Sequence, residues 1–351
     1  MKASIKINGR AIGPGEPTYI IAELSANHNG SLERAIKLVH AAKEAGADAV
    51  KLQTYTADTI TIDHDGKEFT LNGGLWNGSK LYDLYREAYT PWEWLPILKA
   101  EANRLDIDLF SSPFDHTAVD FLNEMGVPAY KVASFEIVDI PLLKKIASTG
   151  KPVIISTGMA NLFEIDEAVR TFRTNGCSDL ALLKCTSAYP ASPKEVNLRT
   201  ISHMSQAFGV PTGLSDHTLG IEVPVAAVAL GANIIEKHFT LSRAEAGPDN
   251  VFSLEPSEFK TMVRAVRTVF DAIGEVSYDL TEEQNLCKTL RRSLFVIKDI
   301  KKGQTFSEEN IKSIRPAGGL HTRYYEIVIR TRAATDIKRG TPLNWKHILI
   351  D

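Results

Sequence analysis

The sequence of 351 residues has few cysteines, no long apolar run and no large excess of either charge sign. Cys177, Cys185 and Cys287 are widely spaced and form no CxxC pair, which indicates reduced thiols in a cytoplasmic protein. No apolar run reaches the length of about 18 residues that a membrane span needs. Residues 1–8 alternate like a strand and lack the apolar core of a signal peptide. A net charge of −3 argues against a nucleic-acid partner.

Short apolar runs alternate with amphipathic segments along most of the chain. Each run is apolar on both faces, as in strands buried in a parallel sheet. The intervening segments have helical periodicity, as at Ala35, Ile36, Leu38, Val39 and Ala42. The eight runs are residues 18–22, 49–52, 108–111, 129–133, 152–156, 180–185, 211–214 and 234–237.

Eight strands, each followed by a helix, over about 270 residues predict a (β/α)8 TIM barrel. The alternative is an open doubly wound sheet, but no Gly-rich phosphate turn follows the first strand. Thr90, Pro91 and Glu93 predict a helix start with Thr90 as its N-cap. Residues 54–90 are too long for a simple connection between a strand and its helix. They include a tyrosine-rich helical stretch at 82–89. This segment either contributes to the active site or is a surface excursion whose tyrosines pack on the core.

The last part of the chain predicts a separate small module. After a helix that ends near Ile273, a polar connector carries an acidic run at 279–284, which indicates a linker with a partial helix. Residues 299–311 resemble residues 336–348, which predicts a pseudo-symmetric β-rich fold that packs on something for stability. The predicted division is a catalytic barrel at 1–275, a linker at 276–290 and the module at 291–351.

Polar residues end every predicted strand, and in a barrel these ends build the active site. One strand-end Lys is usually a solvated charge, and one Ser is usually a turn residue. Their coincidence at one end of the barrel is a strong signal, and two lysines with several hydroxyls suit a phosphate or carboxylate ligand. The set is Glu23, Lys51, Gln53, Ser111, Ser112, Lys131, Ser134, Ser156, Thr157, Thr186, Ser187, Tyr189, Ser215, His217, Glu236 and His238.

His217 and His238 follow neighbouring predicted strands, and an acidic residue lies near each of them, Asp216 and Glu236. A lone strand-end histidine is more often a hydrogen-bonded structural residue, but the pair predicts a metal site with positions open to substrate oxygens. Two imidazoles with oxygen ligands favour Mn²⁺ or Mg²⁺ over a structural zinc. Cys185 has no base beside it in sequence, so we interpret it as structural.

Ten short motifs together resemble the sialic acid synthase family, whose members condense phosphoenolpyruvate with an amino sugar. The resemblance covers the whole chain, because the repeat-bearing tail is similar to the antifreeze-like (SAF) domain that ends these enzymes. Residues 81–94 and 315–326 are similar to the pseudaminic acid branch of the family. The ten motifs are residues 21–30, 45–54, 111–115, 131–134, 156–159, 185–190, 213–218, 236–240, 247–249 and 253–256.

The resemblance implies a role for each site residue. His217 and His238 would bind the metal, and Glu23 and Glu236 would handle protons and orient water. Arg315 would reach the acetamido group from the partner subunit of a domain-swapped homodimer. The open-chain sugar would be addressed by Gln53, Asn77, Tyr189 and Asp249. Phosphoenolpyruvate would be held by Lys51, Ser112, Lys131, Ser134, Ser156, Ser187 and Ser215.

Three alternatives stay open from the sequence. The same chemistry could use N-acetylmannosamine or the legionaminic acid precursor, since Ser112 and Ser187 stand where N-acetylneuraminate synthases often have Thr and Asn. Another barrel enzyme is the second alternative: a sugar-phosphate synthase, for which no spare basic cluster is present, or an aldolase using Lys131 or Lys51 as a Schiff-base nucleophile. The third is a tail that acts as an ice-binding or interaction module, although this tail is rich in Lys and Arg.

Overall fold

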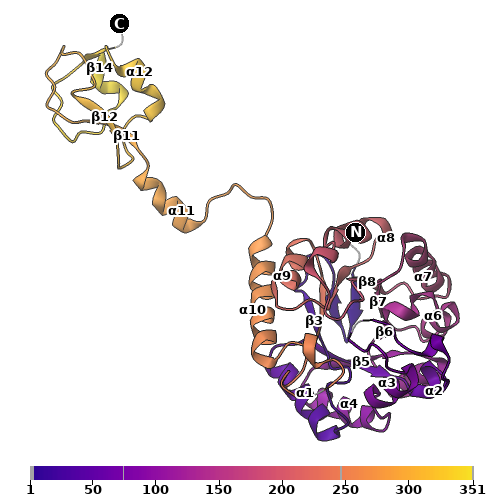
Figure 1. The fold of residues 1–351 in the computed structure, drawn as a ribbon. Helices are drawn as coiled ribbons and strands as arrows, with labels where there is room; N and C mark the ends of the chain where they lie inside the picture. Colours follow the sequence, from indigo (N-terminus) through magenta and orange to yellow (C-terminus); the bar gives the residue numbers. More distant parts are fainter. Residues whose placement is uncertain (1–3, 74, 246, 350–351) are drawn as a thin grey trace. The chain divides into compact units, whose positions relative to one another are not determined.

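The computed structural model describes residues 4–73, 75–245 and 247–349. Its contacts divide the chain into two units, Met1–Gly274 and Glu275–Asp351. In the first unit eight parallel strands close into a barrel, in the order β10-β3-β4-β5-β6-β7-β8-β9 (Figure 1). The predicted TIM barrel is therefore confirmed. The strands are β3 (Tyr19–Glu23), β4 (Ala49–Thr54), β5 (Asp108–Pro113), β6 (Tyr130–Val132), β7 (Val153–Ser156), β8 (Leu180–Cys185), β9 (Thr212–Asp216) and β10 (Ile234–His238).

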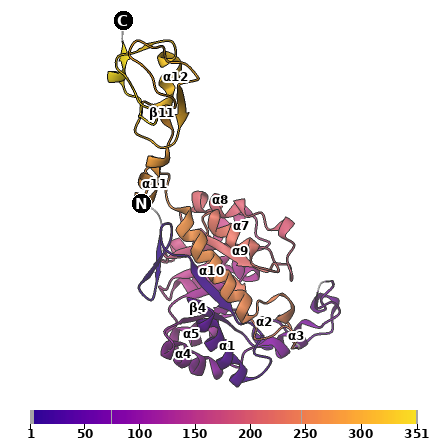
Figure 2. The same ribbon diagram turned by 90° about the vertical axis from the view of Figure 1, so that its left-hand side faces the viewer.

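A ring of helices covers the outside of the barrel (Figures 1 and 2). The first of them shows why: Ser31 caps it, and it buries Ala35, Leu38, Val39 and Ala42. These are four of the five predicted periodic positions, and the fifth, Ile36, is partly buried. The barrel helices are α1 (Leu32–Glu44), α4 (Trp94–Arg104), α5 (His116–Glu124), α6 (Ile140–Ala147), α7 (Leu162–Thr174), α8 (Arg199–Phe208), α9 (Glu222–Ala229) and α10 (Pro256–Ile273). No helix in the described ranges is both long and apolar enough to cross a membrane.

A hairpin of β1 (Ile5–Ile7) and β2 (Arg10–Ile12) lies at the amino ends of the barrel strands. Arg10 forms an ion pair with Asp48, directly before β4, and Asn8 hydrogen-bonds to Asp108 at the start of β5. This hairpin lies at the end of the barrel opposite the strand carboxyl ends. The sequence predicted a strand in residues 1–8 but not its partner.

The insertion after β4 contains α2 (Ala57–Ile60), η1 (Lys67–Phe69) and α3 (Leu81–Ala88), and it extends beside the barrel (Figure 2). The helix predicted at 82–89 is confirmed. The predicted helix start at Thr90 is wrong, because α4 begins at Trp94. The Thr90 hydroxyl instead lies 3.1 Å from Nε2 of His28, and residues 91–93 form a turn.

The second unit has a small hydrophobic core of its own. It contains α11 (Glu282–Cys287), η5 (Lys288–Leu290), β11 (Ser293–Val296), β12 (Ile311–Ile314), η6 (Thr322–Tyr324), α12 (Tyr325–Val328), β13 (Arg332–Ala333), η7 (Trp345–His347) and β14 (Ile348–Leu349).

The internal repeat makes two equivalent turns that bind each other. Asp299 accepts from the backbone N of Arg339 at 2.8 Å, and Asp336 accepts from the backbone N of Lys302 at 2.8 Å. Each carboxylate also pairs with a lysine of the opposite turn. The predicted pseudo-symmetric arrangement is thus confirmed.

Candidate active site

Buried charges gather where β3, β4 and β10 end. Nζ of Lys51 lies 2.8 Å from Oε2 of Glu23 and 3.4 Å from Oε1 of Glu236, and all three side chains are at most 5% exposed. The Ser112 hydroxyl, from β5, lies 3.5 Å from the same ammonium. Because the strands are parallel and in register, His238 pairs with Glu23 across the point where the barrel closes.

A second lysine lies on the other side of Glu236. Nζ of Lys131 donates to Oγ of Ser156 at 2.7 Å and lies 4.0 Å from Oε1 of Glu236. Ser215 donates to the same carboxylate oxygen at 3.0 Å. The structure therefore brings these predicted anion-binding residues together around one carboxylate.

Burial and charge set the ionisation of this group. Burial lowers the pKa of Lys51, but the carboxylates beside it outweigh burial and raise the pKa to about 12. Burial prevails at Lys131 and lowers its pKa to about 8. Burial raises the pKa of Glu23, whereas at Glu236 the two lysines outweigh burial and lower the pKa. Glu236 is therefore the ionised carboxylate, and Glu23 is the one more able to carry a proton.

Ser134 and Ser187 converge on the backbone of Gly158, just beyond β7. Oγ of Ser134 accepts from the backbone N of Gly158 at 3.1 Å. A Cβ at Gly158 would overlap the hydroxyls of both serines. This close approach explains why a glycine follows Ser156 and Thr157 in the motif.

The two histidines lie side by side, with ring centroids 5.3 Å apart. Nδ1 of His217 lies 3.0 Å from the carbonyl oxygen of Thr186, which can only accept, so the ring lone pair is left on Nε2. Nδ1 of His238 is buried and has no hydrogen-bond partner among the described residues, and the same holds for Oε2 of Glu236. Two imidazoles with free lone pairs fit a divalent metal. No group of three or more His, Cys, Asp and Glu in the described ranges could hold one, so further ligands would be oxygens of substrate or water.

Cys185 lies beside this pair, with Sγ 3.9 Å from Nδ1 of His217. Burial raises the pKa of the thiol, but the hydrogen bond to His217 outweighs it and lowers the pKa to about 7. Burial lowers the pKa of His217, and Cys185 outweighs that and raises it. Burial and the neighbouring His217 hold the pKa of His238 well below its usual range. No base adjoins Cys185 in sequence, but His217 reaches it in space from the next strand.

The predicted sugar-binding residues Gln53 and Asp249 both hydrogen-bond to Ser25. Gln53 donates to Oε1 of Glu23 at 2.9 Å and to Oγ of Ser25 at 3.0 Å, and the Ser25 hydroxyl bonds the buried carboxylate of Asp249. Tyr189 lies against His217, with ring centroids 4.4 Å apart. Ser25 was missed as a site residue although it lies in the first motif.

Asn77, predicted to contact the sugar, does not join this group. Asn77 is exposed, and its Oδ1 accepts from the backbone N of Gly73 at 2.6 Å within the inserted loop. Its neighbour Trp76 instead contacts Tyr189, with ring centroids 5.5 Å apart. The predicted sugar residue Arg315 belongs to the second unit, where it directly follows β12.

Glu136, in η2 (Ser134–Val138), is a further carboxyl that the sequence reasoning missed. Its Oε2 is buried without a hydrogen-bond partner in the described part of the chain. Burial raises the pKa of Glu136 to about 7, against the opposing charge of Lys131. Its position shortly after the end of β6 could have identified Glu136 as a candidate site residue from the sequence.

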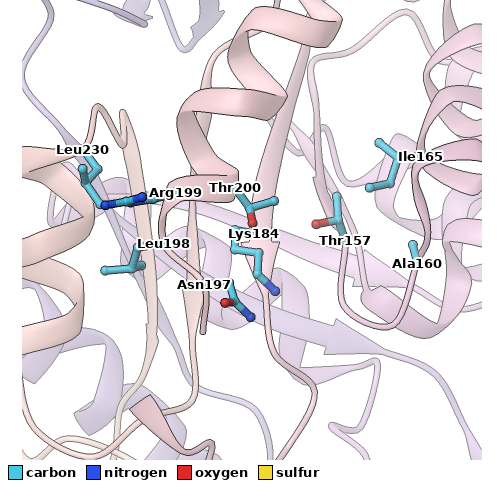
Figure 3. A pocket seen from close by; sticks show the side chains of 9 residues that line it. All are labelled: Thr157, Ala160, Ile165, Lys184, Asn197, Leu198, Arg199, Thr200 and Leu230. Atoms are coloured by element: carbon cyan, nitrogen blue, oxygen red, sulfur yellow. The ribbon is translucent and has the colours of Figure 1, made fainter. Parts of the chain in front are cut away.

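A cavity of about 520 Å³ lies between β8 and helices α7 and α8. Figure 3 shows that the Lys184 ammonium and the Arg199 guanidinium in its lining point in different directions. Lys184 donates to the carbonyl of Cys185 at 2.7 Å. The two cations in its lining therefore do not converge on one point.

A closed barrel whose strand ends collect two lysines, two carboxylates and two imidazoles has the layout of a TIM-barrel enzyme, in which this rim builds the active site. A sequence profile described as NeuB family matches residues 38–278, and one described as SAF domain matches residues 291–349. The chain belongs to the NeuB family. The resemblance to sialic acid synthases with an antifreeze-like tail is thereby confirmed.

Several proteins with assigned names are similar to this chain over most of its length. The chain is 47% identical over 325 residues to the pseudaminic acid synthase of Campylobacter jejuni, covering 93% of this chain and 95% of that protein. It is 44% identical over 336 residues to the pseudaminic acid synthase of Helicobacter pylori, covering 94% and 97%. The crystal structure of N-acetylneuraminic acid synthetase from Leptospira borgpetersenii in complex with citrate superposes with a TM-score of 0.73 at 32% identity, covering 82% and 95%.

Proposed function

We propose that this protein is a pseudaminic acid synthase, which joins phosphoenolpyruvate to 2,4-diacetamido-2,4,6-trideoxy-L-altrose and releases phosphate. The observation that carries the chemistry is the meeting of two buried lysines with a histidine pair at one barrel rim. The choice of sugar rests on the relatives with that name, which match over nearly the whole chain. A cytoplasmic location is part of the proposal and rests on the three free cysteines.

Phosphoenolpyruvate binds to the lysine and serine group. Lys51 stays protonated at any working pH because its pKa is about 12. Lys131 adds a second positive charge below its pKa of about 8. The hydroxyls of Ser112, Ser134, Ser156, Ser187 and Ser215 supply the hydrogen bonds that orient carboxylate and phosphate oxygens.

His217 and His238 would hold the metal, Mn²⁺ or Mg²⁺, which when bound polarises the sugar aldehyde as a Lewis acid. Gln53 and Asp249 orient the open-chain sugar beside it. Tyr189 limits its position on the side of the imidazoles.

The bond forms between C3 of phosphoenolpyruvate and the aldehyde carbon, whose oxygen takes a proton. Glu23 is the donor we assign, because burial raises its pKa. Water then adds to C2 and loses one proton, and the tetrahedral carbon expels phosphate, which takes the remaining hydroxyl proton as the C2 carbonyl forms. Glu236 orients this water as an ionised carboxylate, and Glu136, with a pKa of about 7, exchanges the proton with solvent.

Histidine substitution tests the metal assignment. His217→Ala should abolish turnover and weaken Mn²⁺ binding together, because one of two protein ligands is lost. His203→Ala is the matched control, since His203 is exposed on α8. Full activity of the first variant would overturn the assignment.

The working form in this proposal is a domain-swapped homodimer in which Arg315 of the partner subunit reaches the sugar's acetamido group. Apolar side chains at the barrel rim support a covering partner: Phe135 is 58% exposed, Met159 61% and Phe163 85%. Light scattering combined with activity tests this, and a fully active monomer would remove Arg315 from the site.

A Schiff-base aldolase is the second candidate. The observation in its favour is Lys131, whose pKa of about 8 leaves part of it neutral at physiological pH. Borohydride reduction in the presence of both substrates separates the two functions. We expect no covalent mass on Lys131 or Lys51, and a trapped adduct would favour the aldolase.

A further inference from the structure

Trp76 lies in a loop that is held by its own hydrogen bonds. Thr70 and Lys80 form an antiparallel bridge, and the backbone N of Leu71 donates to the carbonyl of Ser79 at 2.9 Å. The side-chain oxygen of Asn77 accepts a hydrogen bond from the backbone N of Gly73 within the same loop. The loop therefore has a built shape, and Trp76 is the residue in it that reaches the barrel's aromatic side chains.

Trp76, Tyr189 and Phe252 form one aromatic wall. The ring centroids of Trp76 and Tyr189 are 5.5 Å apart, and those of Tyr189 and Phe252 are 5.3 Å apart. The wall ends on the metal-site imidazoles, because Tyr189 lies 4.4 Å from His217 and Phe252 lies 4.9 Å from His238, again between centroids. Three separate loops thus bring apolar faces to the side of the mouth where the sugar's reacting end must lie.

The indole N–H of Trp76 is the one polar group of this wall that is buried and lacks an acceptor in the described ranges. An indole nitrogen can only donate, and a buried donor without an acceptor is costly. Trp92 shows the ordinary arrangement, with its Nε1 donating to the carbonyl of Tyr55 at 3.1 Å. The free N–H of Trp76 is therefore suited to an acceptor on a ligand.

We propose that Trp76 determines sugar specificity, and this rests on the proposed function. Its indole N–H donates to the carbonyl oxygen of an acetamido group, and its ring faces pack on the methyl groups of a deoxy, diacetamido sugar. A sugar with hydroxyls in place of the second acetamido group and the C6 methyl would bury unpaired hydroxyls against the wall. Trp76 thus favours the less hydroxylated substrate.

Trp76→Phe tests the N–H separately from the ring. We expect kcat/KM for the diacetamido altrose to fall about three- to tenfold, as for the loss of one hydrogen bond, with KM for phosphoenolpyruvate unchanged. The ratio of kcat/KM between that sugar and N-acetylmannosamine should fall too. Trp76→Ala should lower the ratio further. Trp92→Phe is the matched control, because the N–H that it loses is bonded within the protein, and its ratio should stay at the wild-type value.

The outcomes separate this inference from the proposed function. A wild-type enzyme that prefers N-acetylmannosamine overturns the proposed function and the selection by Trp76 together. A wild-type enzyme that prefers the altrose sugar, with an unchanged ratio in Trp76→Phe and Trp76→Ala, overturns only the role of Trp76. Melting temperatures of all three variants identify any loss that comes from unfolding.

Discussion

A buried ion pair lies on the outer face of the two strands that carry the metal-site histidines. Nζ of Lys237 lies 2.5 Å from Oδ2 of Asp216 and also bonds the carbonyl of Thr218, and both charged side chains are at most 1% exposed. Asp216 in turn accepts from the backbone N and the hydroxyl of Thr218 at 3.1 and 2.9 Å. The pair therefore fixes the backbone on both sides of His217.

Lys237→Met should strongly destabilise the barrel, because it leaves the Asp216 carboxylate buried without a counter-charge. Breaking a buried pair from one side costs about 3–5 kcal/mol. For a unit of this size that corresponds to a melting temperature lower by roughly 6–20 °C. Asp216→Asn combined with Lys237→Met removes both charges and should recover much of the loss.

The assay is thermal and urea unfolding of the four chains of this double-mutant cycle, with Mn²⁺ affinity measured where each is folded. Lys37→Met is a matched control, since the Lys37–Glu33 pair is exposed and should matter little. A Lys237→Met chain that melts with the wild type would refute the reasoning. So would a double variant less stable than either single one.

Three further results are expected. As pH rises through about 8, Lys131 loses its proton and KM for phosphoenolpyruvate should rise; steady-state kinetics with a flat KM would contradict this. Burial lowers the pKa of His28 to about 4, so as pH falls the unfolded chain binds a proton at this histidine before the folded chain does. The free energy of unfolding should therefore fall by up to about 3 kcal/mol as pH drops from 6.5 to 4. Urea titrations of His28→Asn should show a smaller fall in the free energy of unfolding over this pH range. Gly158→Ala should raise KM for phosphoenolpyruvate about tenfold or more while the chain stays folded, because its Cβ displaces the Ser134 and Ser187 hydroxyls; an unchanged KM would place those serines outside the site.

The barrel and the gathering of its polar strand ends could be predicted because both follow from local pattern and topology. Buried runs that alternate with amphipathic helices allow few folds, and parallel strands bring their carboxyl ends to one rim. Lys51, Lys131 and Glu236 are far apart in sequence, yet a closed barrel requires their strand ends to meet.

The features that the sequence did not predict are contacts between loops or between neighbouring strands, which the local sequence pattern does not determine. Thr90 looks like a helix cap, but its hydroxyl bonds His28 from another loop. Cys185 has no base near it in sequence, whereas His217 lies beside it across neighbouring strands. The sequence alone does not show whether Trp76 or its neighbour Asn77 faces the barrel, because hydrogen bonds within the loop decide this.

The most direct test of the proposed function is phosphate release from phosphoenolpyruvate with Mn²⁺, with and without chelator. The sugars offered are 2,4-diacetamido-2,4,6-trideoxy-L-altrose, N-acetylmannosamine and the legionaminic acid precursor. We expect chelator-sensitive release with the altrose sugar alone. Release with only one of the other sugars would contradict the assigned substrate, and no release with any of them would contradict the synthase chemistry.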